Sequence, residues 1–348
     1  MGAHLRRTQR RFSSAYSGLN CLFFRWQYTL FSTFKTRTMH VLRAILCLGF
    51  VGWAAYAHAC DACGSAVGSG QWGLMPQTRR FALSLRYGQQ AFHTRHSMLY
   101  AENFSREQIR LTELSLRFAL SPRWQLMASL PMLRTAQNYA FAGQETRIWG
   151  LGDGAMIANF TAFNTAADTS RTSSYSQQLG FYAGIKTPTG STWSRQSNSP
   201  SLNPNLQTGT GSWDFLFGAM HTQRFNERWG AYAEASARLN TVGRDDFRFG
   251  NRFALQARGF YHWRAALDSR WQLLAQAGLS YEANGMDTHR KTIVFGSQTQ
   301  TLFATAAADV YLGAFVVSAQ YQAPIWQTSG DEMRFRRSRW QVQLHYVF

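Results

Sequence analysis

Apolar and polar side chains alternate along most of the chain after residue 80, in segments of about ten residues. The final segment shows the pattern most clearly, because Gln341, Gln343 and His345 separate large apolar residues. Those apolar residues are Trp340, Val342, Leu344, Tyr346 and Phe348. Successive side chains of a β-strand point to opposite faces of the sheet. The pattern therefore predicts strands with one apolar and one polar face, as in a transmembrane β-barrel.

The same alternation recurs along the chain and sets the expected fold. We expect twelve strands, at residues 80–92, 108–119, 123–133, 152–163, 175–186, 213–223, 228–240, 252–264, 270–282, 299–309, 311–323 and 338–348. Clusters of Gly, Asn, Asp, Ser and Thr separate these segments, and no useful length of helical period interrupts them. The expected fold is all-β: a transmembrane, antiparallel, up-and-down β-barrel of about twelve strands over residues 80–348.

The expected connections alternate in length, which supports this topology. Short turns are expected at 119–123, 223–228, 264–270 and Asp309–Tyr311. Long outer loops are expected at 93–107, 134–151, 187–212, 241–251, 283–298 and 324–337. The connection at 164–174 breaks the rule, since it is too long for a tight turn. Short periplasmic turns, long outer loops and an even strand number place both termini of the barrel in the periplasm of a bacterial outer membrane.

Composition favours a barrel over a helical membrane protein. Aromatic residues make up 15% of the chain and charged residues only 16%, yet the mean hydropathy is -0.29. The net charge of +18 arises partly in the first 59 residues, which hold eight Lys or Arg and no acidic residue. The remaining basic residues are scattered and mostly Arg, without a basic helix or RNA-binding motif. Nucleic acid is therefore not an expected partner.

Residues 1–59 are expected to be absent from the mature protein. Residues 39–59 have a short basic start and an apolar run that ends in Ala57-His58-Ala59, the pattern of a signal peptide. The apolar run is short for a membrane-spanning helix. Residues 1–38 are then either an over-extended start or a long basic extension of the signal.

Cys60 and Cys63 would begin the mature chain, in a periplasmic segment at residues 60–79. In an oxidising compartment a disulfide is the default for such a pair, with plain thiols as a variant. The two thiolates could instead supply half a site for a soft metal ion. A lipid anchor at Cys60 is a third possibility, although the usual preceding Leu is missing. Because Gly64 follows Cys63, a c-type haem is excluded, and we expect no other cofactor.

The chain ends in Tyr346-Val347-Phe348. A terminal Phe with an aromatic residue two positions earlier is a tail pattern of many bacterial outer-membrane barrels. An exposed last strand of this kind suits edge pairing with a second protein. Tyr346 and Phe348 are therefore the expected signal for the barrel assembly machinery.

Three glycine-rich motifs resemble a known family. They are Gly150-Leu151-Gly152-Asp153, the run Gly184-Ile185-Lys186-Thr187-Pro188-Thr189-Gly190, and Gly209-Thr210-Gly211-Ser212-Trp213-Asp214-Phe215. In order and spacing they are similar to the meta-pathway phenol-degradation family of outer-membrane transporters. The resemblance implies an outer-membrane channel or uptake protein, often associated with aromatic compounds. Read from the residues alone, the motifs are structural: glycines for unusual backbone angles, Pro188 to end a strand, and Asp153 and Asp214 to bind loop amides, with direct ligand contact as the alternative.

Charged residues on the polar faces are the candidate lumen residues, because a charge on the lipid face costs roughly 2–4 kcal/mol near the midplane. The candidates are Arg86, Glu113, Arg117, Asp214, Glu234, Arg238, Arg258, His262 and Glu282. No nucleophile elbow, phosphate-binding loop or zinc-protease motif is present in the sequence. His262 and His345 lack the neighbouring Ser and Asn pattern of a barrel lipase, so we do not expect an enzyme.

The expected function is a channel in the outer-membrane lipid for passive passage of small solutes, and the family resemblance implies apolar or aromatic ones. The alternative is a closed, non-conducting barrel that acts as a binding or metal-linked partner through Cys60 and Cys63. A twelve-stranded barrel could enclose either a narrow pore or a cavity filled by side chains. The sequence does not decide between the two.

Overall fold

The structure is a computed structural model that describes residues 80–95, 104–139, 145–165, 175–191, 206–264, 271–330 and 333–348. Residues 1–79 lie outside the described residues. The predictions of an export signal at 39–59 and of a disulfide or metal at Cys60 and Cys63 therefore remain predictions. No helix within the described ranges is long and apolar enough to cross a membrane.

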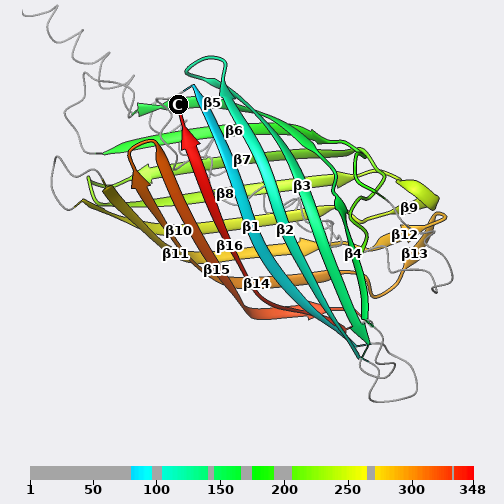
Figure 1. The fold of residues 1–348 in the computed structure, drawn as a ribbon. Coiled ribbons are helices and arrows are strands. Elements are labelled where there is room, and N and C mark those ends of the chain that lie inside the picture. Colours follow the sequence, from blue (N-terminus) through cyan, green and yellow to red (C-terminus); the bar gives the residue numbers. More distant parts are fainter. Residues whose placement is uncertain are drawn as a thin grey trace, which may run out of the picture. The chain divides into compact units, whose positions relative to one another are not determined.

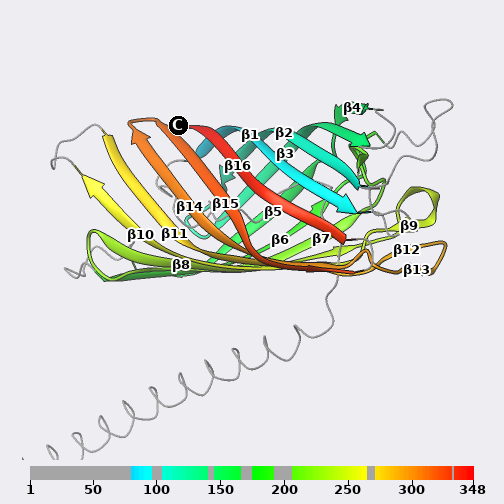
Figure 2. The same ribbon diagram turned by 90° about the horizontal axis from the view of Figure 1, so that it is seen from below.

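Most of the described residues form one closed antiparallel sheet (Figures 1 and 2). Its strands are β1 (Phe81–Arg95), β2 (Phe104–Ala119), β3 (Trp124–Tyr139), β4 (Glu145–Leu151), β5 (Ala155–Asn164), β6 (Ser176–Lys186), β7 (Asp214–Arg224), β8 (Trp229–Asn240), β10 (Arg252–Arg264), β11 (Trp271–Asn284), β14 (Thr299–Leu312), β15 (Phe315–Ser329) and β16 (Met333–Val347). β1 pairs with both β2 and β16, which closes the cylinder. β4 and β5 pair with successive halves of β3 and occupy one position, so the barrel has twelve staves.

Side chains alternate between the outer and inner faces along each strand. In β2, Leu114 and Leu116 are 51% and 46% exposed, whereas Glu113 and Ser115, which alternate with them, are buried. The exposed residues of the other staves are likewise mostly large and apolar. An apolar exterior and a polar interior are the arrangement that a bilayer requires of a closed sheet. The predicted all-β barrel is confirmed.

Aromatic rings form a belt on the outer face, at the end of the barrel where β1 begins and β16 ends. Phe81 stacks on Phe118 and on Phe348, with ring centroids 4.8 and 5.4 Å apart. Trp263 and Trp271, on either side of the β10–β11 connection, lie 4.8 Å apart. Aromatic side chains prefer the headgroup level of a bilayer. This end therefore carries one interfacial girdle, and the C-terminal Phe348 is part of it.

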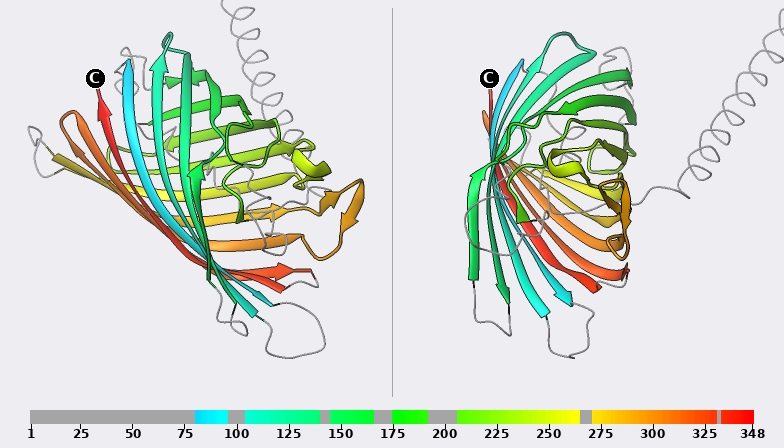
Figure 3. Two further views of the ribbon diagram at one scale, coloured as in Figure 1. Left: turned by 45° about the vertical axis from the view of Figure 1, so that its right-hand side comes forward. Right: turned by 90° about the vertical axis from the view of Figure 1, so that its right-hand side faces the viewer.

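Several strands extend further into the predicted outer loops than the sequence indicated. The expected loop at 134–151 is mostly strand, because β3 continues to Tyr139 and β4 fills 145–151. The expected loops at 241–251 and 283–298 form a second sheet of β9 (Phe247–Arg248), β12 (Asp287–His289) and β13 (Thr292–Val294), beyond the strand ends (Figure 3). Cross-strand hydrogen bonds satisfy backbone groups that a loop would leave to water.

Two predicted details are wrong. The turn expected at Asp309–Tyr311 is strand, since Asp309 pairs with Ser318 in a continuous ladder, and the turn lies at Gly313 with φ of 64°. Glycine readily adopts this left-handed backbone conformation. The alternation of apolar and polar residues does not mark such a turn, so the turn was expected a few residues too early. The strand expected at 152–163 begins only at Ala155, because residues 152–154 form the break between β4 and β5.

Candidate functional site: the barrel lumen

The nine sequence-predicted lumen residues are all buried on the inner face of the barrel. They are Arg86, Glu113, Arg117, Asp214, Glu234, Arg238, Arg258, His262 and Glu282. They do not form one cluster, because their ion pairs and hydrogen bonds join them to different partners at separate places on the inner face. Whether they contact a permeating solute remains a prediction. Tyr346 and Phe348, the predicted assembly signal, are exposed on the outer face.

A cavity lies inside the barrel, lined by inward residues of several strands. Its volume is about 110 Å³, which is room for several waters. Four arginines and two glutamates line it: Arg238, Arg252, Arg258, Arg339, Glu234 and Glu282. Apolar side chains line it as well, among them Ile109, Leu111 and Leu216. The cavity is therefore mixed in character, with an excess of positive charge.

Glu282 on β11 is the common partner of three arginines. Its carboxylate pairs with Arg252 from β10 at 3.0 Å, and with Arg336 and Arg339 from β16. The Arg339 guanidinium also lies over the Phe303 ring, 4.4 Å from its centroid, in a cation–π contact. One carboxylate thus serves three cations, so this side of the lumen keeps a net positive charge.

Glu234 on β8 is held mainly by neutral donors. The Tyr182 hydroxyl donates to its Oε1 at 2.7 Å, while the Tyr232 hydroxyl and the Gln256 amide donate to its Oε2. Tyr182 can cross the inner surface because Gly218 beside it has no side chain. A Cβ on Gly218 would lie 2.2 Å from the Tyr182 ring. Both carboxylate oxygens of Glu234 are therefore engaged without an arginine.

Arg258, on β10, lines the cavity and is only 4% exposed. Its guanidinium donates to the Gln256 side chain, and its Nε has no hydrogen-bond partner in the described part of the chain. The directly paired positions, Tyr232 on β8 and Gly278 on β11, carry no acid. Among the described residues no carboxylate lies within ion-pair distance of it. Buried charges are normally paired, so Arg258 is an unusual feature of this lumen.

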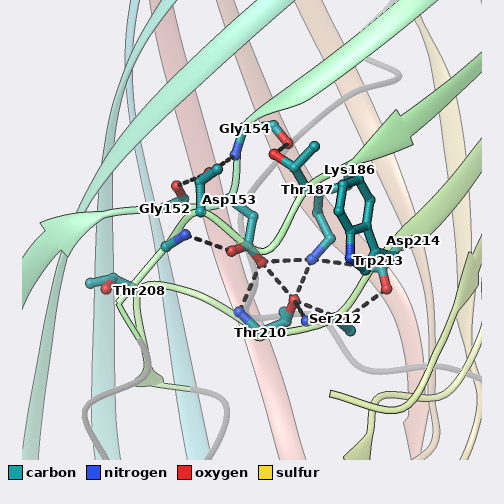
Figure 4. Close-up of polar contacts among 12 residues, drawn as sticks. Gly152, Asp153, Gly154, Lys186, Thr187, Thr208, Thr210, Ser212, Trp213 and Asp214 are labelled. Carbon is teal, nitrogen blue, oxygen red and sulfur yellow. Dashed lines mark hydrogen bonds and ion pairs between the residues drawn. The ribbon is translucent and has the colours of Figure 1, made fainter. Parts of the chain in front are cut away.

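The three glycine-rich motifs meet at one point near the C-terminal end of β6 (Figure 4). Lys186 lies between two carboxylates, with Nζ 2.6 Å from Asp153 Oδ2 and 2.7 Å from Asp214 Oδ2. Its side chain is 1% exposed. Asp153 also accepts hydrogen bonds from the backbone amides of Gly190 and Thr210, at 2.9 and 2.8 Å. We call these five residues the loop anchor.

The loop anchor holds the segment 206–212 against the inside of the barrel wall. Leu206 is buried, and its carbonyl accepts a hydrogen bond from the Thr135 hydroxyl at 2.7 Å. Gly190 and Gly209 lie so close that a Cβ on Gly209 would be 2.5 Å from the Gly190 carbonyl carbon. The glycines of the motifs thus permit close backbone contact between two parts of one loop. The structural interpretation of these motifs fits this geometry.

Sequence analysis missed several inward charges. Lys186 was part of a motif but was not recognised as a lumen residue, although its parity on β6 matches that of the inward Tyr182. Arg339 has the parity of Gln341 and Gln343 and could have been found in the same way. Arg336 could not, because the register shifts opposite Gln90–Phe92 and reverses the parity of β16 there.

The fold defines a class: a closed twelve-stranded antiparallel barrel of the outer-membrane type. No protein-family model and no curated protein matches the sequence. The structure is similar to the COG4313 outer membrane channel from Pseudomonas putida F1, with a TM-score of 0.57 and 16% identity over 81% of this chain and 100% of that one. Weaker likenesses are the β domain of the Bordetella autotransporter BrkA (TM-score 0.45, 11% identity, 78% and 100% covered) and the Ralstonia pickettii toluene transporter TbuX (0.35, 11%, 79% and 91%). Only the first supports the fold.

Proposed function

We propose that this protein is an outer-membrane channel for passive passage of small solutes. The observation that carries the proposal is the polar, cavity-containing interior of a closed barrel whose exterior is apolar. A polar interior costs free energy unless water, partner side chains or a solute solvate it. The similar fold of a protein described as an outer-membrane channel supports the same assignment.

The resemblance of the glycine-rich motifs to phenol-degradation transporters supports aromatic or apolar solutes as cargo. Ile109, Leu111 and Leu216 give the cavity wall an apolar area that such molecules could contact. The belt of outward aromatic rings supports a position in lipid, with barrel assembly through Tyr346 and Phe348.

Swelling of liposomes that contain the purified barrel tests the proposal. Ala254 lines the cavity, and Ala257 three residues later on the same strand is exposed on the outer face. Ala254→Trp should fill part of the lumen and reduce uptake of small sugars and of benzyl alcohol at least several-fold. Ala257→Trp, the matched control, should leave uptake unchanged.

A wild-type barrel that is impermeable to every small solute would contradict the channel. It would favour the closed, non-conducting alternative, in which Cys60 and Cys63 serve a binding or metal-linked role. Metal binding by the wild type, compared with a Cys60→Ser, Cys63→Ser variant, would then test that alternative. Hydrolysis of a chromogenic ester would test for a barrel lipase, which we do not expect.

A further inference from the structure

We propose that the lumen cavity is a binding site for a small organic carboxylate with an apolar body, and that Arg258 holds the carboxylate. This inference rests on the proposed function, because the site would select a solute only if the barrel is a channel. It rests on three observations: the charge of the cavity, the unpaired guanidinium of Arg258, and the apolar wall on the other side of the lumen.

The charge of the cavity is positive at the level of its lining residues. Two glutamates face four arginines there. Glu282 already pairs with Arg252, Arg336 and Arg339. Glu234 has both oxygens occupied by Tyr182, Tyr232 and Gln256. Glu234 keeps its negative charge, but neither carboxylate forms an ion pair with Arg258 among the described residues. An anion that enters the cavity would therefore meet a guanidinium that no carboxylate contacts directly.

Arg258 has the geometry of a ligand-binding side chain. It is more than nine-tenths buried, borders the cavity, and has a buried Nε without a hydrogen-bond partner among the described residues. Gln256, its one hydrogen-bond acceptor, orients the guanidinium from a neighbouring position on the inner face of β10. A guanidinium can bind a carboxylate through two parallel hydrogen bonds, which favours carboxylates over spherical anions.

The apolar wall faces this arginine from across the barrel. Ile109 and Leu111 lie on β2, which is six staves from β10 in the twelve-stave order and therefore opposite to it. Both residues line the same cavity as Arg258. A ligand that spans the cavity would thus present an anionic group to β10 and an apolar body to β2. Apolar lining with a few placed polar groups is the usual composition of a small-molecule site.

Benzoate and benzyl alcohol are a matched pair of probes, since they differ mainly in the carboxylate. Titration calorimetry of the purified full barrel in detergent should show benzoate binding, with benzyl alcohol at least about tenfold weaker, as expected for loss of a charge-assisted contact. Acetate, which lacks the apolar body, should also bind more weakly than benzoate.

Arg258→Gln should weaken benzoate binding about tenfold or more and leave benzyl alcohol unchanged. Arg258→Lys, which keeps the charge without the planar fork, should give an intermediate affinity and serves if the Gln variant folds poorly. Arg228→Gln is the control, because Arg228 is an exposed residue of the β7–β8 turn. Retained heat-modifiable gel migration would show that each variant is folded.

Equal binding of benzoate and benzyl alcohol, or benzoate binding that Arg258→Gln leaves intact, would overturn the carboxylate site. Failure of the channel has a different signature. A barrel that binds benzoate through Arg258 but passes no solute in liposome swelling would keep the site and contradict the proposed function. A barrel that passes solutes but does not bind benzoate more tightly than benzyl alcohol would keep the proposed function and contradict the carboxylate site.

Discussion

The loop anchor and the central cavity use the same kinds of side chain in opposite ways. In the anchor, Lys186 has two carboxylate partners and Asp153 receives backbone amides, so every charge is closely held. In the cavity, Arg258 lacks a carboxylate and Glu282 is shared by three arginines. The anchor is therefore suited to fixing a loop, and the cavity is suited to receiving an anion.

The sequence motifs lie in the anchor and not in the cavity. The anchor is built from the three motifs that carry the family resemblance, and its contacts are internal to the protein. The cavity has no motif, and its arginines come from β8, β10 and β16, which are scattered along the sequence. A motif that carries a family resemblance can thus serve to hold a loop, while the residues that we propose to bind a solute lie elsewhere.

The largest expected effect is on the anchor. Lys186→Met leaves two buried carboxylates without their cation, which should lower the free energy of unfolding by about 3–5 kcal/mol. Urea titration followed by heat-modifiable gel migration measures this loss. Lys291→Met is the control, because Lys291 is exposed in the β12–β13 turn and should change little. Equal stability of the two variants would show that the anchor is not a structural centre.

A smaller stability loss is expected where the cavity loses its shared acid. Glu282→Gln should cost about 1–3 kcal/mol, since three guanidiniums lose a charged acceptor while two of them, Arg252 and Arg339, line the cavity. The same change should increase the preference of the channel for anions over cations. The zero-current potential across a planar bilayer under a potassium chloride gradient measures that preference. A shift toward cations would contradict the proposed charge balance.

A steric change tests the hydrogen bond between Tyr182 and Glu234. Gly218→Ala should displace the Tyr182 ring and break its hydrogen bond to Glu234, at a cost of about 1–3 kcal/mol. Gly259→Ala is the matched control, because no atom of the described residues lies within 4 Å of the position its Cβ would take. Urea midpoints of the two variants test this directly. A Gly218→Ala barrel as stable as the control would mean that the Tyr182 ring position is not required.

The fold could be predicted because a bilayer imposes a simple rule on every strand. Lipid outside and water inside make alternation visible in sequence, as in Leu114, Ser115 and Leu116. The register shift opposite Gln90–Phe92 follows no such rule, so Arg336 was missed. The extension of β3 beyond Leu133 was missed because its outward residues, Arg134, Ala136 and Asn138, are not large apolar side chains.

The candidate site could be predicted only in part. Parity identified inward charges such as Arg258 and Glu282, but not which of them are paired. Pairing depends on neighbours from distant strands, as with Glu282 of β11 and Arg339 of β16. The loop anchor shows the same limit, since its three motifs meet only through the folding of segment 206–212.

The smallest expected effect concerns salt. The excess charge of the cavity acts over a screening length of about 10 Å at 0.1 M salt and about 3 Å at 1 M. The anion preference of the wild type should therefore decrease as mean salt concentration rises in that range. Zero-current potentials at fixed concentration ratio measure the change. A preference that does not respond to salt would locate selectivity in steric contacts instead of in the arginines.

The central claim is that the inner face of β10 lines a path for solutes while its outer face meets lipid. Its most direct test is the bilayer current of Ala254→Cys and Ala257→Cys barrels, in a Cys60→Ser, Cys63→Ser background, on addition of a charged, membrane-impermeant thiol reagent. We predict that the current through Ala254→Cys barrels falls while that of Ala257→Cys barrels stays constant. An unchanged current in both variants would contradict the claim.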